Sequence, residues 1–280
     1  CVLGRRWELG VLLMSRSRVS PDVVTFTSLM KSCVGSKQWT RALALLEESD
    51  LRRMTPDVIL WSSAMNACAS AAKWAWALLL MSTMKSRSVH PNVVSISVAM
   101  SACARGAQWH RSLHMFVRAR EQSQCIDETA FGTALHACAA GSLWQHGIEL
   151  LLEMSQCNLS PGAASYNAAI SACSACSQWV HALWLLSHSG MNADTIGHNA
   201  VLSALGRASH WSSCLWLLEL MSGRTVFPDV VSIGAALTAC AIGFRWESAS
   251  ALVNSAHQVS TDLGVVGYTS AMRACEAGRQ

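Results

Sequence analysis

Residues 21–39, Pro-Asp-Val-Val-Thr-Phe-Thr-Ser-Leu-Met-Lys-Ser-Cys-Val-Gly-Ser-Lys-Gln-Trp, carry the pattern that decides the fold. Phe26, Met30 and Cys33 follow one another at intervals of four and three residues, which places them on one face of a helix. A short turn of small and polar residues comes next, and Trp39 begins a second apolar stripe with the same spacing. The stretch therefore predicts two helices joined by a short turn, with the first helix starting just after a Pro-Asp junction.

This pattern recurs along the whole chain, and three markers keep the same register. The tryptophans that open the second helices lie 32 or 35 residues apart, at Trp7, Trp39, Trp74, Trp109, Trp144, Trp179, Trp211 and Trp246. Six residues before each Trp stands Cys1, Cys33, Cys68, Cys103, Cys138, Cys173, Leu205 or Cys240. The third marker is a Pro-Asp-Val or Pro-Asn-Val junction at Pro21, Pro56, Pro91 and Pro228. Three markers in one register indicate an internal repeat of about 35 residues.

A single helix pair cannot bury both of its faces, so each repeat must stack on its neighbours. The sequence therefore predicts an all-α protein, an α-α superhelix or solenoid of antiparallel two-helix repeats, and we expect the tryptophans to be largely buried. The whole chain, 1–280, reads as one array, which comprises a partial repeat 1–22, seven repeats 23–57, 58–92, 93–127, 128–162, 163–194, 195–229 and 230–264, and a partial repeat 265–280. Repeat 163–194 is three residues short, and we place the deletion at the end of its second helix.

The composition suits a packed array and excludes two classes of protein. Hydrophobic residues make up 51% of the chain and charged residues 14%, which is unlike a disordered segment. The longest apolar run, 74–81, is far shorter than the roughly 20 residues of a membrane span, so no membrane partner is expected. A net charge of +4 is compatible with a nucleic-acid partner without requiring one. The chain opens inside a repeat, at Cys1, which indicates a fragment.

Segments 21–30, 164–173 and 228–232 resemble the pentatricopeptide-repeat family, in an array of the P type. The period, the Pro-Asp junction and the Val-Val-x-aromatic opening all agree with that family. The rival tetratricopeptide pattern, Trp-x-x-Leu-Gly-x-x-Tyr, is absent. The Trp that opens each second helix departs from the commonest pentatricopeptide pattern, which suggests a subtype with the same fold.

The resemblance implies binding of single-stranded RNA, with one base read per repeat by the fifth residue and the last residue of the repeat. These pairs are Thr27 with Asp57, Ser62 with Asn92, Ser97 with Asp127, Asn167 with Asp194, and Asn199 with Asp229, while Thr269 is the fifth residue of the truncated repeat. Two further repeats offer only Gly132 with Gly162 and Gly234 with Gly264. By the family's pairing rule the array would read 5′-G-A-G-n-U-U-n-3′, where n is any base.

Two further sets of residues follow from the same resemblance. The second residue of each repeat would hold neighbouring bases apart as an apolar clamp, at Val24, Ile59, Val94, Ile196, Val231 and Val266. Arg105 and Arg207 occupy matching places at the end of a first helix and would meet phosphates.

Simpler explanations exist for each of these signals. A short polar residue before a helix is often only an N-cap, and this applies to Asp57 and Asp229. Aromatic rings can stack on bases, but the tryptophans stand in core-type stripes. The recurrent cysteines behave as small apolar residues, and the C-x-x-C at Cys173 and Cys176 has no second pair to complete a zinc site.

No catalytic motif accompanies the repeats, so the sequence predicts no enzyme, no cofactor and no small-molecule substrate. The favoured function is an adaptor for an organellar transcript, guiding its processing, stability, editing or translation, in a mitochondrion or plastid by resemblance alone. Two alternatives stay open: a protein-binding α-solenoid scaffold, and the RNA-targeting arm of an enzyme truncated from this chain. Protein partners are compatible with all three.

Overall fold

A computed structural model describes residues 23–36, 38–52, 54, 56–121, 126–189, 194–223, 226–258 and 264–278 of the 280-residue chain. The described residues form fifteen helices and no strand, which confirms the all-α prediction. The sequence markers at Cys1, Trp7 and Pro21 lie outside the described residues. The chain divides into two compact units after Ala140.

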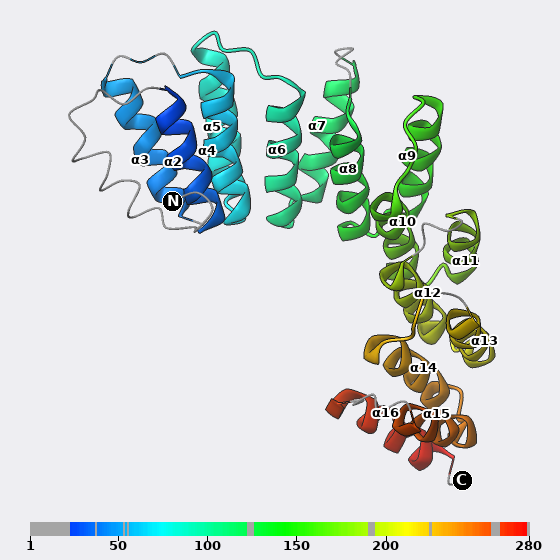
Figure 1. Cartoon of the computed structure of the whole chain (residues 1–280). Coiled ribbons are helices and arrows are strands. Elements are labelled where there is room, and N and C mark those ends of the chain that lie inside the picture. Colours follow the sequence, from blue (N-terminus) through cyan, green and yellow to red (C-terminus); the bar gives the residue numbers. More distant parts are fainter. Residues whose placement is uncertain are drawn as a thin grey trace. The chain divides into compact units, whose positions relative to one another are not determined.

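The first unit contains a layer of first helices and a layer of second helices (Figure 1). Its first helices are α2 (Val23–Gly35), α4 (Val58–Ser70), α6 (Val93–Arg105) and α8 (Glu128–Ala140). Its second helices are α3 (Trp39–Leu51), α5 (Trp74–Ser86) and α7 (Trp109–Glu121). The first helices pack side by side in chain order, and each second helix lies against its own first helix and the next one.

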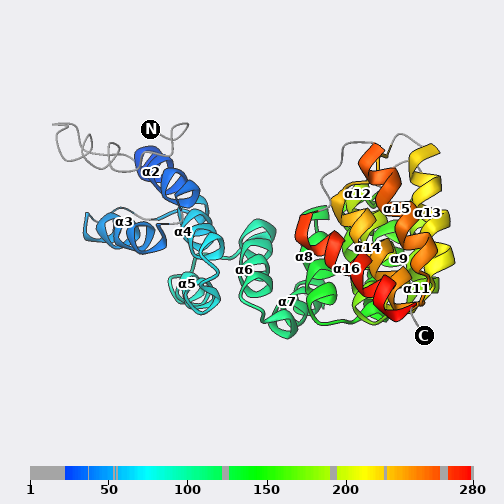
Figure 2. The same ribbon diagram turned by 90° about the horizontal axis from the view of Figure 1, so that it is seen from below.

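The second unit repeats this arrangement, and Figure 2 shows it from below. Its first helices are α10 (Ala163–Ala175), α12 (Thr195–Arg207), α14 (Val230–Ile242) and α16 (Gly264–Ala277). Its second helices are α9 (Trp144–Gln156), α11 (Trp179–His188), α13 (Trp211–Gly223) and α15 (Trp246–Gln258). Helix α11 has 10 residues where α9 has 13, so the shortened repeat loses three residues at the end of its second helix, as expected.

The apolar stripes of the first helices form the core. Phe26, Met30 and Cys33 are at most 1% exposed, and the corresponding stripe of α8 is equally buried. Alanine precedes the cysteine in most repeats and is fully buried there, as at Ala67 and Ala102, where a small side chain lets adjacent first helices approach closely. Burial of these stripes between neighbouring repeats supplies the main stabilisation of each unit.

The turn between the two helices of a repeat depends on the backbone of the marker cysteine. The backbone N–H of Lys73 donates to the carbonyl of Cys68, and that of Gln108 donates to Cys103, both at 2.9 Å. Between each donor and its acceptor, the residue just before the donor adopts a left-handed conformation, with φ 56° at Ala72 and 57° at Ala107. This is the Schellman arrangement that ends a helix, and it sets the angle at which the second helix turns back.

The tryptophans begin the second helices, and the expectation that they are largely buried holds in part. Those at the start of α3, α5, α7, α9, α11 and α13 are only partly buried, and Trp246 is 46% exposed. The physical reason is their place at the end of the stripe, where the turn of the next repeat is the main cover. A Cβ built on Gly106 would lie 2.3 Å from Cδ1 of Trp74, and Arg111 covers the same ring at 4.4 Å. These rings therefore join successive repeats at their edges.

Candidate nucleic-acid interface

The second residues of the first helices form an exposed apolar series. Val24, Ile59 and Val94 in the first unit are 53–70% exposed, and Ile196 and Val231 in the second are 66% and 62% exposed. The residue that follows Ile59, Val94, Ile196 or Val231 is buried in every case. Each of these four side chains therefore projects from the surface at the start of its helix. The side chain of Val266 lies outside the described residues.

The fifth residue and the last residue of a repeat meet directly in three repeats. Asn167 donates from Nδ2 to Oδ1 of Asp194 at 2.8 Å. Asn199 donates from Nδ2 to both carboxylate oxygens of Asp229, at 3.0 and 3.1 Å. The contact repeats in the first unit at 3.3 Å, where the Ser97 hydroxyl donates to an Asp127 carboxylate oxygen. Residues about 30 positions apart are thus brought together at the positions that the family resemblance singles out.

The last residue of a repeat also caps the first helix of the next one. Asp57, Asn92, Asp127, Asp194 and Asp229 each accept, through Oδ1, the backbone N–H of the residue three positions later, at 2.8–3.0 Å. This satisfies one of the N–H groups that a helix start leaves without an intrahelical partner. Capping and pairing occur at the same side chain, so they are not competing explanations of these residues.

The remaining predicted positions differ in what they contact. Ser62 and Asn92 are joined through Ser95, whose hydroxyl lies 3.0 Å from that of Ser62 and donates to Oδ1 of Asn92 at 2.9 Å. Thr27 lies partly buried in α2, and Thr269 is exposed in α16.

Glycines occupy the other pair positions. Gly132 lies within α8 and Gly234 within α14, while Gly162 precedes α10 without a side chain to cap it. Gly264 begins α16 with φ +58°, a conformation that glycine adopts without strain.

A hollow of about 320 Å³ lies beside the pair of Ser62 and Asn92 in the first unit. Ser62 and Asn92 line it together with both flanking clamps, Ile59 and Val94, and with Lys31 from α2. A polar edge, apolar walls on two sides and a nearby cation are the surroundings that an unstacked base and its phosphate require. Lys31 was missed in the sequence, because its place near the hollow depends on how α2 packs against α4.

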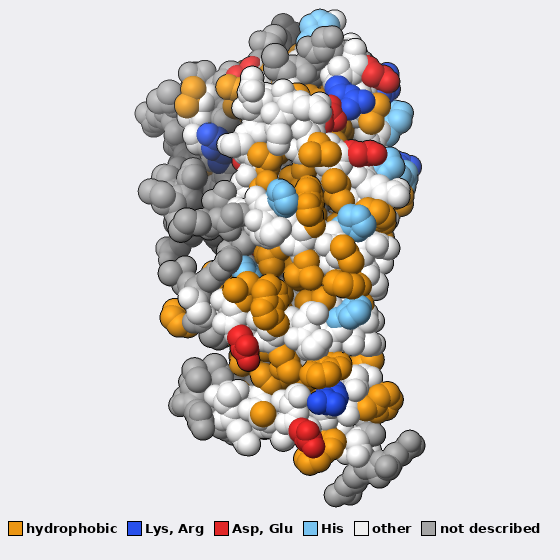
Figure 3. Space-filling view, turned by 90° about the vertical axis from the view of Figure 1, so that its right-hand side faces the viewer, with side chains coloured by type: hydrophobic (Ala, Val, Ile, Leu, Met, Phe, Trp, Pro, Cys, Tyr) orange, Lys and Arg blue, Asp and Glu red, His pale blue; other side chains and the backbone are white. Residues whose placement is uncertain are grey.

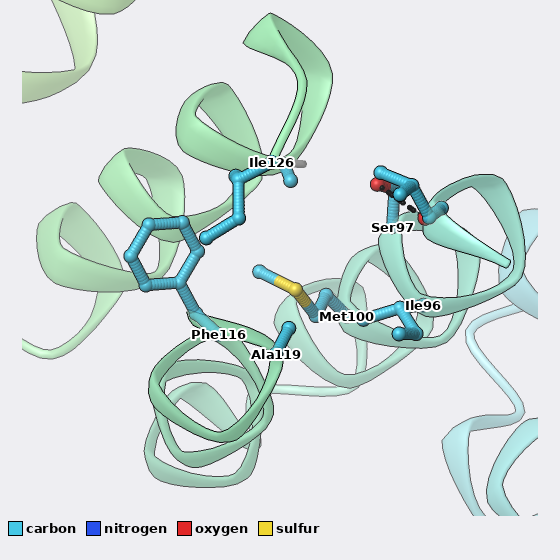
Figure 4. A pocket seen from close by; sticks show the side chains of 8 residues that line it. Ile96, Ser97, Met100, Phe116, Ala119 and Ile126 are labelled. Atoms are coloured by element: carbon cyan, nitrogen blue, oxygen red, sulfur yellow. Dashed lines mark hydrogen bonds between the residues drawn. The ribbon is translucent and has the colours of Figure 1, made fainter. Parts of the chain in front are cut away.

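Behind Ser97 the interior is closed. A cavity of about 10 Å³ lies between α6, α7 and the start of α8, where Phe116, Met100 and Ile126 converge (Figure 4). A volume of this size holds at most about one water molecule. Ser97 therefore has its polar contact to Asp127 on one side and tightly packed apolar side chains on the other.

The two predicted phosphate residues are exposed at the ends of their helices, Arg105 on α6 and Arg207 on α12. Arg207 donates from Nη2 to the Ser174 hydroxyl of the preceding repeat at 2.8 Å. One end of its guanidinium is thereby held against the first-helix layer, and an Arg head has further donors for a phosphate.

Burial also shapes the titration of the thiols. It raises the pKa of Cys68 and Cys173 to about 11 and that of Cys214 to about 12, so these thiols stay neutral at physiological pH. Neutral buried thiols are poor nucleophiles and poor metal ligands. Within the described ranges no group of three or more His, Cys, Asp or Glu side chains could hold a metal ion, and no helix there has the length and apolarity to cross a membrane.

Stacked helix pairs with polar pairs in register along their first helices define a helical-repeat protein of the α-solenoid class. Models of the pentatricopeptide repeat domain match residues 12–70, and models of the single repeat match residues 164–188 and 198–226. The chain therefore carries repeats of the pentatricopeptide-repeat family in both units.

Comparison with solved structures agrees in fold. The maize pentatricopeptide-repeat protein PPR10 aligns with a TM-score of 0.57 at 16% identity, over 99% of this chain and 45% of that one. The PPR10 complex with an 18-nt psaJ RNA element aligns with a TM-score of 0.60 at 17% identity, over 97% and 45%. The PPR domain of Arabidopsis thaliana protein-only RNase P 1, in complex with tRNA, gives a TM-score of 0.54 at 11% identity, over 63% and 95%. The chain thus spans about half the length of PPR10, and no curated protein sequence matches it.

Proposed function

We propose that the chain binds single-stranded RNA and selects its bases one repeat at a time. The observation that carries this proposal is the direct hydrogen bond between the fifth and last residues of three repeats, at 2.8–3.3 Å. Exposed clamp residues lie close to each pair. Helices α6 and α12 carry Val94 and Ile196, and α10 packs against α12. A short polar pair supplies defined donors and acceptors for a base edge, and the clamps supply apolar contact for its faces.

The pairs assign a base to five of the seven repeats. A hydroxyl with Asp would select guanine, Ser62 with Asn92 adenine, and the two Asn–Asp pairs uracil. The glycine pairs offer no side chain to a base edge, so their two positions accept any base. The proposed site is 5′-G-A-G-n-U-U-n-3′.

We further propose that binding at this site guides an organellar transcript in its processing, stability, editing or translation, in a mitochondrion or plastid. The array itself carries out no catalysis in this proposal and needs no cofactor. PPR10 with its psaJ RNA element and the protein-only RNase P domain with tRNA support the choice of RNA as the partner. The second of these also keeps open a role as the RNA-targeting arm of an enzyme.

Selection from a pool of randomised single-stranded RNA tests the partner. Enrichment of a motif with guanine, adenine and adjacent uracils in the proposed order is expected. A pool that is bound without enrichment would contradict base selection, and a pool that is not bound would favour a protein partner.

Substitution of Asn199 by Thr tests the code at one base. The change should move the preference at the sixth position of the site from uracil toward guanine, because a small hydroxyl leaves room for a purine facing Asp229. Discrimination of about 1–3 kcal/mol is expected from one edge contact. Four RNAs that differ only at that base are compared by binding, with wild type and variant, and the other positions should keep their preferences because repeats act mainly locally.

A matched control exists on a second helix, where Asn254→Thr changes the same side chain on α15, outside every predicted base-reading pair. That control should leave every base preference unchanged. An equal loss of affinity of Asn199→Thr for all four RNAs would reduce Asn199 to a structural residue.

One observation favours protein binding as a second function. Hydrophobic side chains gather over the middle of the face shown in Figure 3, with few acidic or basic ones among them. Large exposed hydrophobic residues on the second helices of the second unit include Leu152, Val180, Trp184 and Trp216, at 44–57% exposure. Exposed apolar clusters of this kind are typical of interaction surfaces, and this one lies on the second helices, whereas the proposed base-reading pairs lie on the first helices.

A further inference from the structure

In three repeats the third residue of a first helix lies against the predicted base-reading pair of the repeat before it. Ser232 is fully buried at this place in α14, and its hydroxyl lies within hydrogen-bonding distance of Oδ1 of Asn199 and, at 2.9 Å, of Oδ1 of Asp229, so that its single proton is shared between these two acceptors. The same hydroxyl accepts the backbone N–H of Asp229 at 3.2 Å, which completes a capping box. Ser232 therefore contacts both members of this pair.

These contacts fix the orientation of the Asn199 amide. The Asp229 carboxylate only accepts hydrogen bonds, so the amide nitrogen must face it and the amide oxygen must face away. The Ser232 hydroxyl meets that oxygen, so the amide is held from two sides. Because the two amide hydrogens diverge, one serves the carboxylate and the other is presented to a ligand in a fixed direction.

The neighbouring repeat contains the same pair with a different third residue. Asn167 and Asp194 are faced by Gly197, and a Cβ built there would lie 2.6 Å from Oδ1 of Asn167. The third residue thus abuts the same amide oxygen in both repeats. Glycine leaves room for this oxygen but offers it no hydroxyl, so the Asn167 amide is held by the carboxylate at 2.8 Å without a second side-chain clasp from this position.

The first unit shows the contact once more. Ser95, fully buried at the third place of α6, connects Ser62 with Asn92 through its hydroxyl. Two serines and one glycine at the same place therefore lie against three pairs, of which two are Asn with Asp and one is Ser with Asn.

We infer that the third residue of a first helix is a positioning residue that sharpens base selection by the preceding repeat. The inference rests on the proposed RNA-reading function and adds a third residue to each pair. It has a consequence for two repeats with an identical pair: the base facing Asn199 is selected more sharply than the base facing Asn167, because only the first amide is clasped by a serine.

The experiment measures binding of single-stranded RNAs containing 5′-GAGAUUA-3′, in which the fifth and sixth bases are varied one at a time. Wild type should prefer uracil over cytosine at both places, with the larger ratio at the sixth. Ser232→Ala should lower the ratio at the sixth base about three- to tenfold and leave the fifth unchanged. Gly197→Ala, which displaces the Asn167 oxygen, should lower the ratio at the fifth base alone.

Ser165→Ala is the matched control. Ser165 is 4% exposed at the third place of α10, and the repeat before it carries Gly132 as its fifth residue. The control should leave both base ratios unchanged. Circular dichroism of each variant establishes that the helices are retained.

The outcomes separate this inference from the proposed function. A wild-type chain without preference at either base overturns the proposed function and this inference with it. A wild-type preference that survives intact in both Ser232→Ala and Gly197→Ala overturns the inference alone, as does an equal loss of affinity for all RNAs. A change of ratio confined to the predicted base supports both.

Discussion

At the scale of single residues, the carboxylate of Asp229 has two structural tasks. It caps α14 through Ser232 and holds the amide of Asn199. Partial burial pushes the pKa of Asp229 up, but the hydrogen bonds from Ser232, from Asn199 and from the Val231 backbone together lower it below its ordinary value of 3.8. The charged form is thus the one that the folded chain favours.

The dependence of stability on pH below neutrality tests whether the pKa of Asp229 is lowered in the folded chain. A carboxyl whose pKa is lower in the folded state stabilises the fold above its ordinary pKa, and this contribution is lost as the pH falls through the folded value. The unfolding free energy of wild type should therefore drop below about pH 4, and Asp229→Asn should show a shallower drop, since an amide does not titrate. Urea unfolding from about pH 7 to pH 3 measures both, and identical acid limbs would contradict the assignment.

At the scale of helices, the sequence predicted the elements well and the packing of their ends less well. Helix starts followed from the junctions and the tryptophans, because period and spacing are local properties of the chain. The partial exposure of the tryptophans did not follow, because it depends on the turn of the next repeat, 32 residues beyond Trp74 at Gly106. The contact between the Ser232 hydroxyl and Asn199 could not be predicted for the same reason, since the two residues lie 33 positions apart.

The depth of burial should be visible in alanine variants of two tryptophans. Trp61 is 2% exposed within α4, so Trp61→Ala should destabilise the chain by about 3–5 kcal/mol. Trp109 is partly buried at the start of α7, so Trp109→Ala should lower the unfolding free energy by on the order of 2 kcal/mol, because this ring removes less apolar area from water. Denaturant unfolding compares them, and an equal cost would show that the helix-end rings matter as much as the core.

Glycines provide a second test at this scale. Gly106→Ala should destabilise the fold by about 1–3 kcal/mol, since the new methyl group meets the Trp74 ring while the backbone, at φ −85°, accepts alanine. Gly132→Ala is the control, because a Cβ there has nothing within 4 Å and alanine favours a helix by about 0.5–1 kcal/mol. If both variants lose stability alike, the close approach of the ring is not the cause.

At the scale of the whole molecule, we expect charge to govern the affinity for RNA and the predicted base-reading pairs to govern which bases are selected. The net charge is only +4, so we expect RNA binding to depend on a few well-placed cations such as Lys31, Arg105 and Arg207 and less on the overall charge of the chain. The candidate pairs could be proposed from the sequence only through the family resemblance, because no local signal distinguishes a base-reading Asp from a cap.

Salt dependence measures the number of phosphate contacts. With about four phosphates neutralised, log affinity should fall against log salt concentration with a slope near −3. Arg105→Ala and Arg207→Ala should each weaken binding to all RNA sequences about equally and reduce the slope by about 1. Arg52→Ala, which removes the side chain just after α3 that is paired with Glu48 at 2.6 Å, is the control and should leave the slope unchanged. An affinity independent of salt would argue for an apolar protein partner.

The shared carboxylate also restricts how such an array can change over generations. The last residue of a repeat must remain able to start the next helix, and helix starts favour Asn, Asp, Ser, Thr and Gly. Asn92, Asp127 and Gly162 all belong to this small set. A mutation to a large apolar residue there would weaken the following helix and, under the proposed function, would also remove one base-reading side chain. Under the proposed function, the last residue of a repeat is therefore confined to the residue types with which a helix can begin. New base specificities must then arise mainly through the fifth residue of each repeat.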